Sequence, residues 1–153
     1  MKKVAVLMGS ANDAEKMAPA GETLAKFGVE HEVWAMSAHR NPETVREFVS
    51  SARDNGYGVI IAAAGMAAHL AGVCASCTTL PVIGVPLSGG AINGIDSLYS
   101  TVQMPPGMPV ATVAINGAQN AALLAVQILA LADESLAAKL ADARAEWKPK
   151  QLG

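Results

Sequence analysis

The stretch Val4-Ala5-Val6-Leu7-Met8, followed by Gly9-Ser10-Ala11-Asn12-Asp13, decides the fold of this 153-residue chain. The first five residues are apolar without alternation, which is typical of a parallel strand covered by helices on both faces. The next five break that pattern, and beyond them Met17, Leu24 and Phe27 recur on one helical face. The chain therefore begins with a strand, a turn and a helix.

The same unit recurs along the rest of the sequence. Further apolar runs predict strands at residues 31–36, 59–62, 81–85 and 110–115, and the long stretch 86–107 is predicted to be irregular. Asn41 as N-cap and Pro42 at the first helical position predict the start of a helix. Other helices are expected at 66–77, at 120–131, and from about 134 through Leu136, Leu140 and Trp147. Strands alternating with helices predict an α/β fold, a three-layer, doubly wound parallel sheet with right-handed crossovers.

The composition limits the partners of the chain. Lys and Arg total 11 against 13 Asp and Glu, a formal net charge of −2, so no overall field attracts nucleic acid or an anionic membrane. Residues 1–153 have the length of one domain. Apolar residues make up 52% and charged residues 16%, which exceeds what one small core covers and predicts an obligate homo-oligomer. The helix at 120–131 is apolar on nearly every face, so we expect the C-terminal helices, about 120–147, to pack into that oligomer.

No apolar segment has the length of a membrane anchor or a signal peptide. The run at 4–8 is too short for the core of a signal peptide and leads directly into a turn. The run at 121–132 is interrupted by Gln127 and falls short of the roughly 18 to 20 residues that span a bilayer. We therefore expect a cytoplasmic protein that does not enter a membrane.

The two cysteines, Cys74 and Cys77, have the C-x-x-C spacing of some zinc and redox sites. A zinc site needs two further ligands at suitable spacing, and the three histidines do not supply them. The alternative is that both are small apolar residues packed in an alanine-rich helix, where cysteine is commonly buried. The sequence favours this second interpretation.

Ligands of open parallel sheets bind beyond the carboxyl ends of the strands, where loops and helix N-termini converge. The first loop of this kind follows the strand at 4–8. Its backbone N–H groups and the Ser10 hydroxyl, at a helix N-terminus, could cradle a phosphate or ribose oxygens. Asp13 fits such a site, and it fits equally well as a simple N-cap.

The loop Ser37-Ala38-His39-Arg40 lies at the same edge. Histidine is the side chain that titrates near neutrality, so His39 could transfer protons while Arg40 binds a phosphate with two hydrogen bonds. The alternative is a solvated pair on a polar loop, and the position at the ligand-binding edge favours the site. His69, near the start of the predicted third helix, lies close to this edge, although a lone histidine in an apolar helix is often a core residue. The loop at 88–107 is long enough to bind or cover a ligand or to cross to a neighbouring subunit.

Five ordered motifs in this sequence resemble the PurE family. They are Met8-Gly9-Ser10-x-x-Asp13, Ser37-Ala38-His39-Arg40-x-Pro42, Ala64-Gly65-x-Ala67-Ala68-His69-Leu70, Asp96-Ser97-Leu98-Tyr99-Ser100 and Val102-Gln103-Met104-Pro105-x-Gly107. The resemblance implies a flavodoxin-like fold and a homo-octamer with sites shared between subunits. It also implies an aminoimidazole ribonucleotide as substrate, and neither a metal nor an organic cofactor.

The same resemblance assigns roles to individual residues. It implies that His39 is the general acid/base, that Ser10, Asp13 and Arg40 bind the ribose phosphate, and that Ser37, Gly65 and His69 belong to the substrate site. Asn12 stands where many members have Ser, and its amide can still bind an oxyanion. Met66, Ala71 and a shortened stretch between Ile115 and Asn120 also depart from the family, and we expect them to alter loop geometry.

Three functions remain to be compared. The Ala-Ala-His-Leu segment around His69 resembles the branch of mutases that convert 5-(carboxyamino)imidazole ribonucleotide to the 4-carboxylate in purine synthesis. The second branch carboxylates aminoimidazole ribonucleotide directly with CO2. A function of another class is a flavodoxin-like nucleotide-binding module without catalysis, because a fold alone does not fix function.

Overall fold

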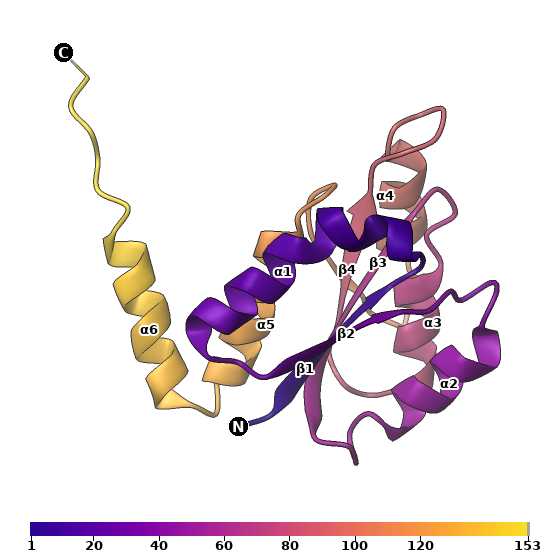
Figure 1. Cartoon of the computed structure of the whole chain (residues 1–153), viewed down its shortest axis with the longest axis horizontal. Helices are drawn as coiled ribbons and strands as arrows, with labels where there is room; N and C mark the ends of the chain where they lie inside the picture. The colour runs from indigo at the N-terminus through magenta and orange to yellow at the C-terminus, as the bar shows by residue number, and fades with distance from the viewer. Residues whose placement is uncertain (153) are drawn as a thin grey trace.

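The fold is built on a five-stranded parallel sheet with the order β2-β1-β3-β4-β5 (Figure 1). The structure is a computed structural model that describes residues 1–152. The strands are β1 Lys3–Met8, β2 His31–Ala35, β3 Tyr57–Gly65, β4 Val82–Leu87 and β5 Ala111–Thr112. This order is that of flavodoxin-like proteins, so the predicted doubly wound α/β fold is confirmed.

Helices cover both faces of the sheet. They are α1 Ala14–Phe27, α2 Pro42–Ser51, α3 Leu70–Cys77, α4 Ile95–Val102, α5 Ala118–Ala130 and α6 Glu134–Ala145, with a short 3-10 helix, η1 Ala11–Asp13, before α1. Val4 and Val6 pack toward α1 and α5, whereas Ala5 and Leu7 pack toward α2 and α3. Because successive residues of a strand point to opposite faces, a strand buried on both sides must be apolar throughout.

The prediction that residues 86–107 are irregular is wrong, because α4 lies within them. This helix buries the polar side chains of Ser97 and Thr101 and exposes large apolar ones, which inverts the pattern from which helices are predicted. The buried Ser97 hydroxyl is satisfied by donating to the carbonyl oxygens of Leu87 (2.8 Å) and Gly94 (2.9 Å). On the buried face of α4, local hydrogen bonds therefore take the place of the apolar contacts that usually hold a helix against a core.

Other boundaries also differ from the predictions. The strand β3 is longer than predicted and runs to Gly65, so the next helix begins at Leu70 rather than at Met66. Met66 has a φ of 53°, which ends the strand in a turn. The strand β4 continues through Pro86 to Leu87, and the predicted strand at 110–115 is reduced to Ala111–Thr112.

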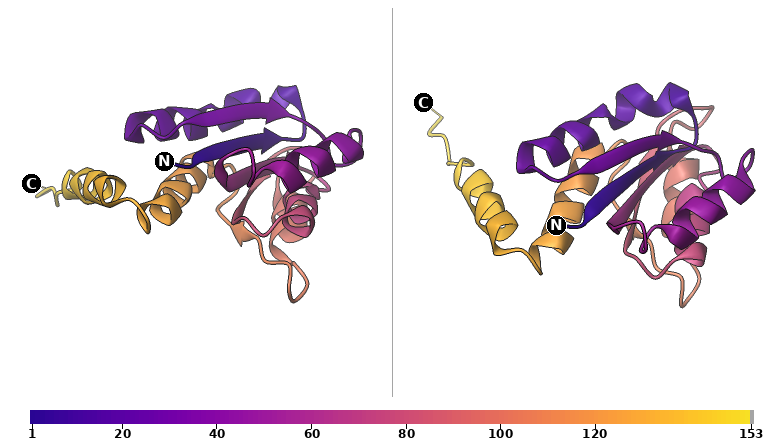
Figure 2. Two further views of the ribbon diagram at one scale, coloured as in Figure 1. Left: turned by 90° about the horizontal axis from the view of Figure 1, so that it is seen from below. Right: turned by 60° about the horizontal axis from the view of Figure 1, so that its bottom comes forward.

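Helix α5 packs against α1 and the sheet, whereas α6 projects from the body of the protein (Figure 2). Leu136 of α6 is fully buried and Leu140 packs against the same core, but Trp147 lies beyond the end of α6 and is 90% exposed. The predicted apolar face of the last helix therefore does not extend to Trp147 within one chain. None of the helices within residues 1–152 has the length and apolar character needed to cross a membrane.

The structure places Cys74 in the core, as predicted. It is fully buried in α3, and burial, with a smaller contribution from Cys77, raises the pKa of the Cys74 thiol to about 12. A thiol that stays protonated is neither a nucleophile nor a metal ligand at neutral pH. Cys77 is partly exposed, and both are free thiols.

Candidate active site

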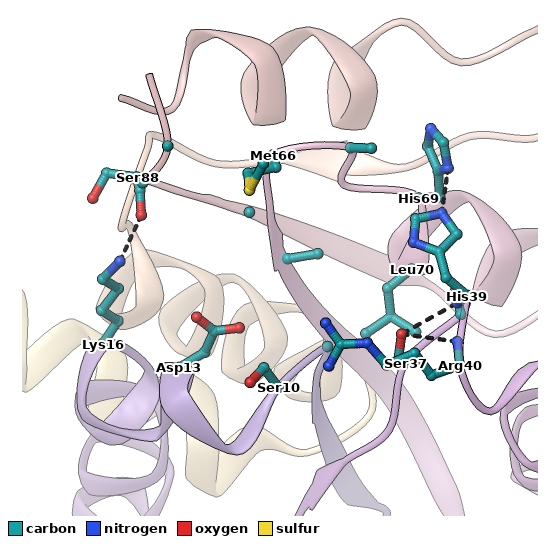
Figure 3. A pocket seen from close by; sticks show the side chains of 17 residues that line it. Ser10, Asp13, Lys16, Ser37, His39, Arg40, Met66, His69, Leu70 and Ser88 are labelled. Atoms are coloured by element: carbon teal, nitrogen blue, oxygen red, sulfur yellow. Dashed lines mark hydrogen bonds between the residues drawn. The ribbon is translucent and has the colours of Figure 1, made fainter. Parts of the chain in front are cut away.

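A cavity of about 310 Å³ lies at the carboxyl ends of the strands, where the loops after β1, β2, β3 and β4 meet (Figure 3). It is lined by seven of the eight predicted site residues: Ser10, Asp13, Ser37, His39, Arg40, Gly65 and His69. Asn12 does not line the cavity; its backbone N–H donates to Ser10 Oγ (3.2 Å) and its side chain is exposed. The structure therefore brings together residues that are up to 59 positions apart, from Ser10 to His69.

Ser37 shapes the loop that carries His39 and Arg40. Its hydroxyl accepts hydrogen bonds from the backbone N–H groups of His39 and Arg40, each at 3.2 Å. Its own N–H donates to Asn41 Oδ1 (3.2 Å). Asn41 thus occupies the predicted N-cap position of α2, but its side chain holds the loop instead of capping the helix. This partly buried network orients the two functional side chains toward the cavity.

His39 and His69 form a hydrogen-bonded pair. His39 Nε2 lies 2.7 Å from His69 Nδ1, and the two rings meet edge to face with centroids 4.8 Å apart. One of these nitrogens must carry the shared proton, because a neutral imidazole has one donor and one acceptor. His69 directly precedes α3, so the loop after β2 and the turn after β3 meet at this bond. The alternative of a core histidine is wrong, since His69 is exposed at the cavity.

The side of the cavity away from the histidine pair carries charged side chains. The guanidinium of Arg40 points toward the side of the cavity formed by Ser10 and Asp13 (Figure 3). Within residues 1–152 the only ion pair joins Lys3 and Glu32 at the amino ends of β1 and β2, at the end of the sheet away from this site. The charge of Arg40 is therefore not neutralised by a carboxylate within 4.0 Å. Asp13 stands at the N-terminal end of α1, but its carboxylate makes no capping hydrogen bond within the described residues. Both side chains are therefore available to a ligand.

The prediction missed one lysine that lines the same cavity. Lys16 lies three residues after Asp13 on the same side of α1, and its ammonium group donates to the carbonyl oxygen of Ser88 (2.5 Å). The helical spacing from Asp13 was a signal that could have identified Lys16. Met66 is 60% exposed at the cavity, next to Gly90 of the loop that follows β4.

The cavity has the features of a site for a small molecule. It combines a histidine pair, one guanidinium, one ammonium group and hydroxyls beside backbone N–H groups. Among residues 1–152 no three His, Cys, Asp or Glu side chains are grouped as they would be around a metal ion. The fold and this site together define an enzyme of the flavodoxin-like α/β class, with proton-transfer groups beside binding groups at the carboxyl ends of the strands.

Comparisons with known proteins identify the family. The family described as AIR carboxylase matches residues 3–150. An N5-carboxyaminoimidazole ribonucleotide mutase of Saccharolobus solfataricus is 56% identical over 140 residues, 92% of this chain and 89% of that protein. A chloroplastic phosphoribosylaminoimidazole carboxylase of Vigna aconitifolia is 51% identical over 146 residues, 95% of this chain but 26% of that protein. The crystal structure of Treponema denticola PurE is similar with a TM-score of 0.85 and 28% identity, over 94% of this chain and 89% of that one. This chain belongs to the AIR carboxylase (PurE) family.

Proposed function

We propose that this chain is an N5-carboxyaminoimidazole ribonucleotide mutase. It is an isomerase that moves the carboxyl group from the exocyclic nitrogen to C4 of the imidazole ring in purine synthesis. The observation that carries this proposal is the paired imidazole of His39, which faces the same cavity as Arg40 in a chain 56% identical to a mutase. Acid/base chemistry and the binding of an anion are the two requirements of this reaction.

Each side of the cavity binds a different part of the substrate. Arg40, Ser10 and Asp13 bind the ribose phosphate, the guanidinium through the phosphate and the carboxylate through the ribose hydroxyls. Asn12 contributes through the turn that its backbone N–H makes with Ser10 Oγ. The imidazole ring of the substrate then lies toward His39, with Gly65 and His69 beside it.

The reaction has two steps, both served by His39. In the first, the bond between N5 and the carboxyl carbon breaks, its electron pair stays on N5, and protonated His39 donates a proton to that nitrogen. CO2 and aminoimidazole ribonucleotide result. In the second, the C4 carbon attacks CO2, one C=O electron pair moves to oxygen, and neutral His39 removes the C4 proton. The proton returns to His39, so the substrate is isomerised without oxidation or a net proton change.

Proximity supplies much of the rate. Confining CO2 against C4 replaces an encounter between two dilute reactants with a reaction inside one complex. The electron pair comes from the electron-rich imidazole itself, so we expect no metal or organic cofactor to be required.

A labelling experiment tests this function. Purified protein receives the carbamate with a 13C-labelled carboxyl group in unlabelled bicarbonate, and the 4-carboxylate is followed by mass spectrometry. We expect a labelled product. Replacing His39 with Asn should lower the rate by a factor on the order of 100 or more while the substrate still binds. Replacing Arg40 with Met should weaken substrate binding, and an unchanged affinity would remove Arg40 from the phosphate site.

Direct carboxylation of aminoimidazole ribonucleotide is a second candidate. It is favoured by the 51% identity to the Vigna carboxylase over 95% of this chain. Rapid turnover of aminoimidazole ribonucleotide with bicarbonate, and slow turnover of the carbamate, would establish this activity instead. If the protein binds the nucleotide but catalyses neither reaction, the non-catalytic nucleotide-binding module would be its function.

We also propose a homo-octamer into which α5 and α6 pack. Ile95, Tyr99 and Val102 form one stripe on α4 and are 46%, 61% and 47% exposed in the single chain. Such apolar stripes are usually covered by a partner. Native mass spectrometry should give eight chains, and a fully active monomer would contradict the proposal.

We also propose that the protein is cytoplasmic. Cys74 and Cys77 are free thiols, and free thiols persist in reducing compartments.

A further inference from the structure

The segment from Ser88 to Gly90, which we name the β4 loop, forms one wall of the active-site cavity. All three residues line it, and Ser88 lies on the side opposite His39 (Figure 3). Gly90 has a φ of 66°, and a Cβ at that position would lie 3.3 Å from Met66 Cγ. The backbone of the β4 loop therefore lies directly against the Met66 side chain, and together they close one side of the site.

Ser88 is held by two side chains from different parts of the chain. Asn116 accepts a hydrogen bond from Ser88 N (3.0 Å) through Oδ1 and donates one to Ser88 Oγ (2.8 Å) through Nδ2. Lys16 donates to Ser88 O (2.5 Å) from α1, on the side of the cavity away from His39 (Figure 3). The N–H, the hydroxyl and the carbonyl of Ser88 are thus all engaged.

The geometry of Asn116 suits it to this contact. It has a φ of 58°, in the left-handed region that asparagine tolerates better than most residues, and its N–H donates to Pro86 O (2.8 Å). The backbone of Asn116 is therefore fixed to the end of β4, and its side chain reaches Ser88 two residues further on. This arrangement occurs in the segment between β5 and α5.

The ends of the wall are fixed, whereas its middle depends on Ser88. The Ser97 hydroxyl binds the carbonyl oxygens of Leu87 and Gly94, which stand on either side of the loop. Gly89 and Gly90 lie between these points, and glycines impose little conformational restraint of their own. The side chains of Lys16 and Asn116 therefore determine whether the wall stays in place.

We propose that Lys16 and Asn116 are positioning residues that hold the β4 loop as a wall and thereby keep CO2 inside the site between the two steps. The inference rests on the proposed mutase function, because only a reaction that passes through free CO2 requires a closed wall. Lys16 and Asn116 act through Ser88 and do not touch the reacting atoms.

If the β4 loop is held less firmly, CO2 can escape and a side reaction competes with isomerisation. When CO2 escapes after the first step, the N5–carbon bond has broken and N5 has taken a proton from His39. The products are then aminoimidazole ribonucleotide and dissolved CO2, and His39 regains its proton from water. Escaped 13CO2 mixes with unlabelled bicarbonate, so a 4-carboxylate formed afterwards lacks the label.

The test compares the fate of the label in three variants with that in the wild type. Lys16→Met removes the ammonium group and keeps the length of the side chain. Asn116→Gly removes both hydrogen bonds and tolerates the positive φ. Lys26→Met is the matched control, because Lys26 lies on the same helix but away from the active-site cavity. Each variant receives 13C-labelled carbamate in unlabelled bicarbonate, and initial rates of labelled product, unlabelled product and free aminoimidazole ribonucleotide are measured after subtraction of the rate without enzyme.

We expect Lys16→Met to raise the ratio of unlabelled to labelled product about three- to tenfold, the equilibrium shift for about one lost hydrogen bond. Asn116→Gly removes two hydrogen bonds and should raise the ratio at least as much. Lys26→Met should match the wild type. A variant that merely folds less well would lower all rates together and leave this ratio unchanged.

Three results would overturn the inference. Unchanged label retention in both variants would show that the wall does not depend on these contacts. A higher KM for Lys16→Met with full label retention would make Lys16 a substrate ligand instead. Wild-type protein that forms no 4-carboxylate, or forms it without the label, would refute the proposed reaction and this inference with it, whereas the first two results leave the proposed function intact.

Discussion

The hydrogen bond between His39 and His69 predicts how the kinetic effects of replacing the two histidines combine. If His69 acts only by orienting His39, removing His69 matters only while His39 is present. We therefore expect His69→Ala to slow the reaction, but the double variant His39→Asn/His69→Ala to be no slower than His39→Asn alone. Residues that act as one unit are expected to behave in this non-additive way.

The size of each effect follows from the geometry. The bond joins His39 Nε2 to His69 Nδ1 at 2.7 Å between two exposed rings. A hydrogen bond of this kind contributes about 0.5 to 1.5 kcal/mol, so His69→Ala should cost a factor of about 2 to 12 in kcat. His39→Asn removes the proton-transfer group itself and should cost a factor on the order of 100 to 10,000. Independent catalytic roles would instead multiply, making the double variant slower again by the His69 factor.

The assay is the initial rate of 4-carboxylate formation at saturating carbamate, with KM measured for each variant. His31→Ala is the control, because His31 opens β2 and its Nδ1 contacts Val29 O (3.1 Å) outside the site. Its kcat should equal that of the wild type. A double variant about tenfold slower than His39→Asn would refute the positioning role and give His69 a proton-transfer step of its own.

Three further predictions concern stability and reactivity. Gly84→Ala would place a Cβ against Thr101 Cγ2, so we expect a loss of about 1 to 3 kcal/mol in urea unfolding, and unchanged stability would contradict the packing. Cys74 should resist alkylation at pH 8 in the folded protein and react after unfolding, as followed by mass spectrometry, because burial raises its pKa to about 12. The hydroxyl of Ser135 and nearby N–H groups hold the pKa of Asp133 below its usual value, so its stabilisation is present above the unfolded pKa and is lost as the pH falls through the folded one. The difference in Tm between wild type and Asp133→Ala should therefore shrink below about pH 4, and a constant difference would contradict the capping.

The sheet could be predicted because burial on both faces leaves a clear pattern. Continuous apolar runs such as that of β1 are required wherever helices cover both sides. The helix α4 could not be predicted in this way. Its inner face is held by the Ser97 hydroxyl, and its outer face carries Tyr99, so its apolar pattern points away from its own core.

The site could be predicted in large part for a related reason. Parallel strands end at one edge, so polar residues that follow them, such as Ser10 and His39, must lie together. The sequence did not indicate that Asn12 would face away from the cavity, because that depends on the turn made with Ser10 Oγ. Nor did it indicate the contact between Asn116 and Ser88, because a side chain that bridges two loops leaves no periodic signal.

The strand order explains why the histidines come from different loops. The chain turns from β1 to β2 on one side and continues through β3, β4 and β5 on the other, so the loops diverge at β1 and β3 and leave room for a ligand between them. His39 arrives from the β2 side and His69 from the β3 side, and their hydrogen bond spans that gap. A change in either loop therefore alters the proton-transfer pair without disturbing the sheet, whereas the β4 loop, fixed by contacts from α1 and from the segment after β5, determines how well the gap is closed.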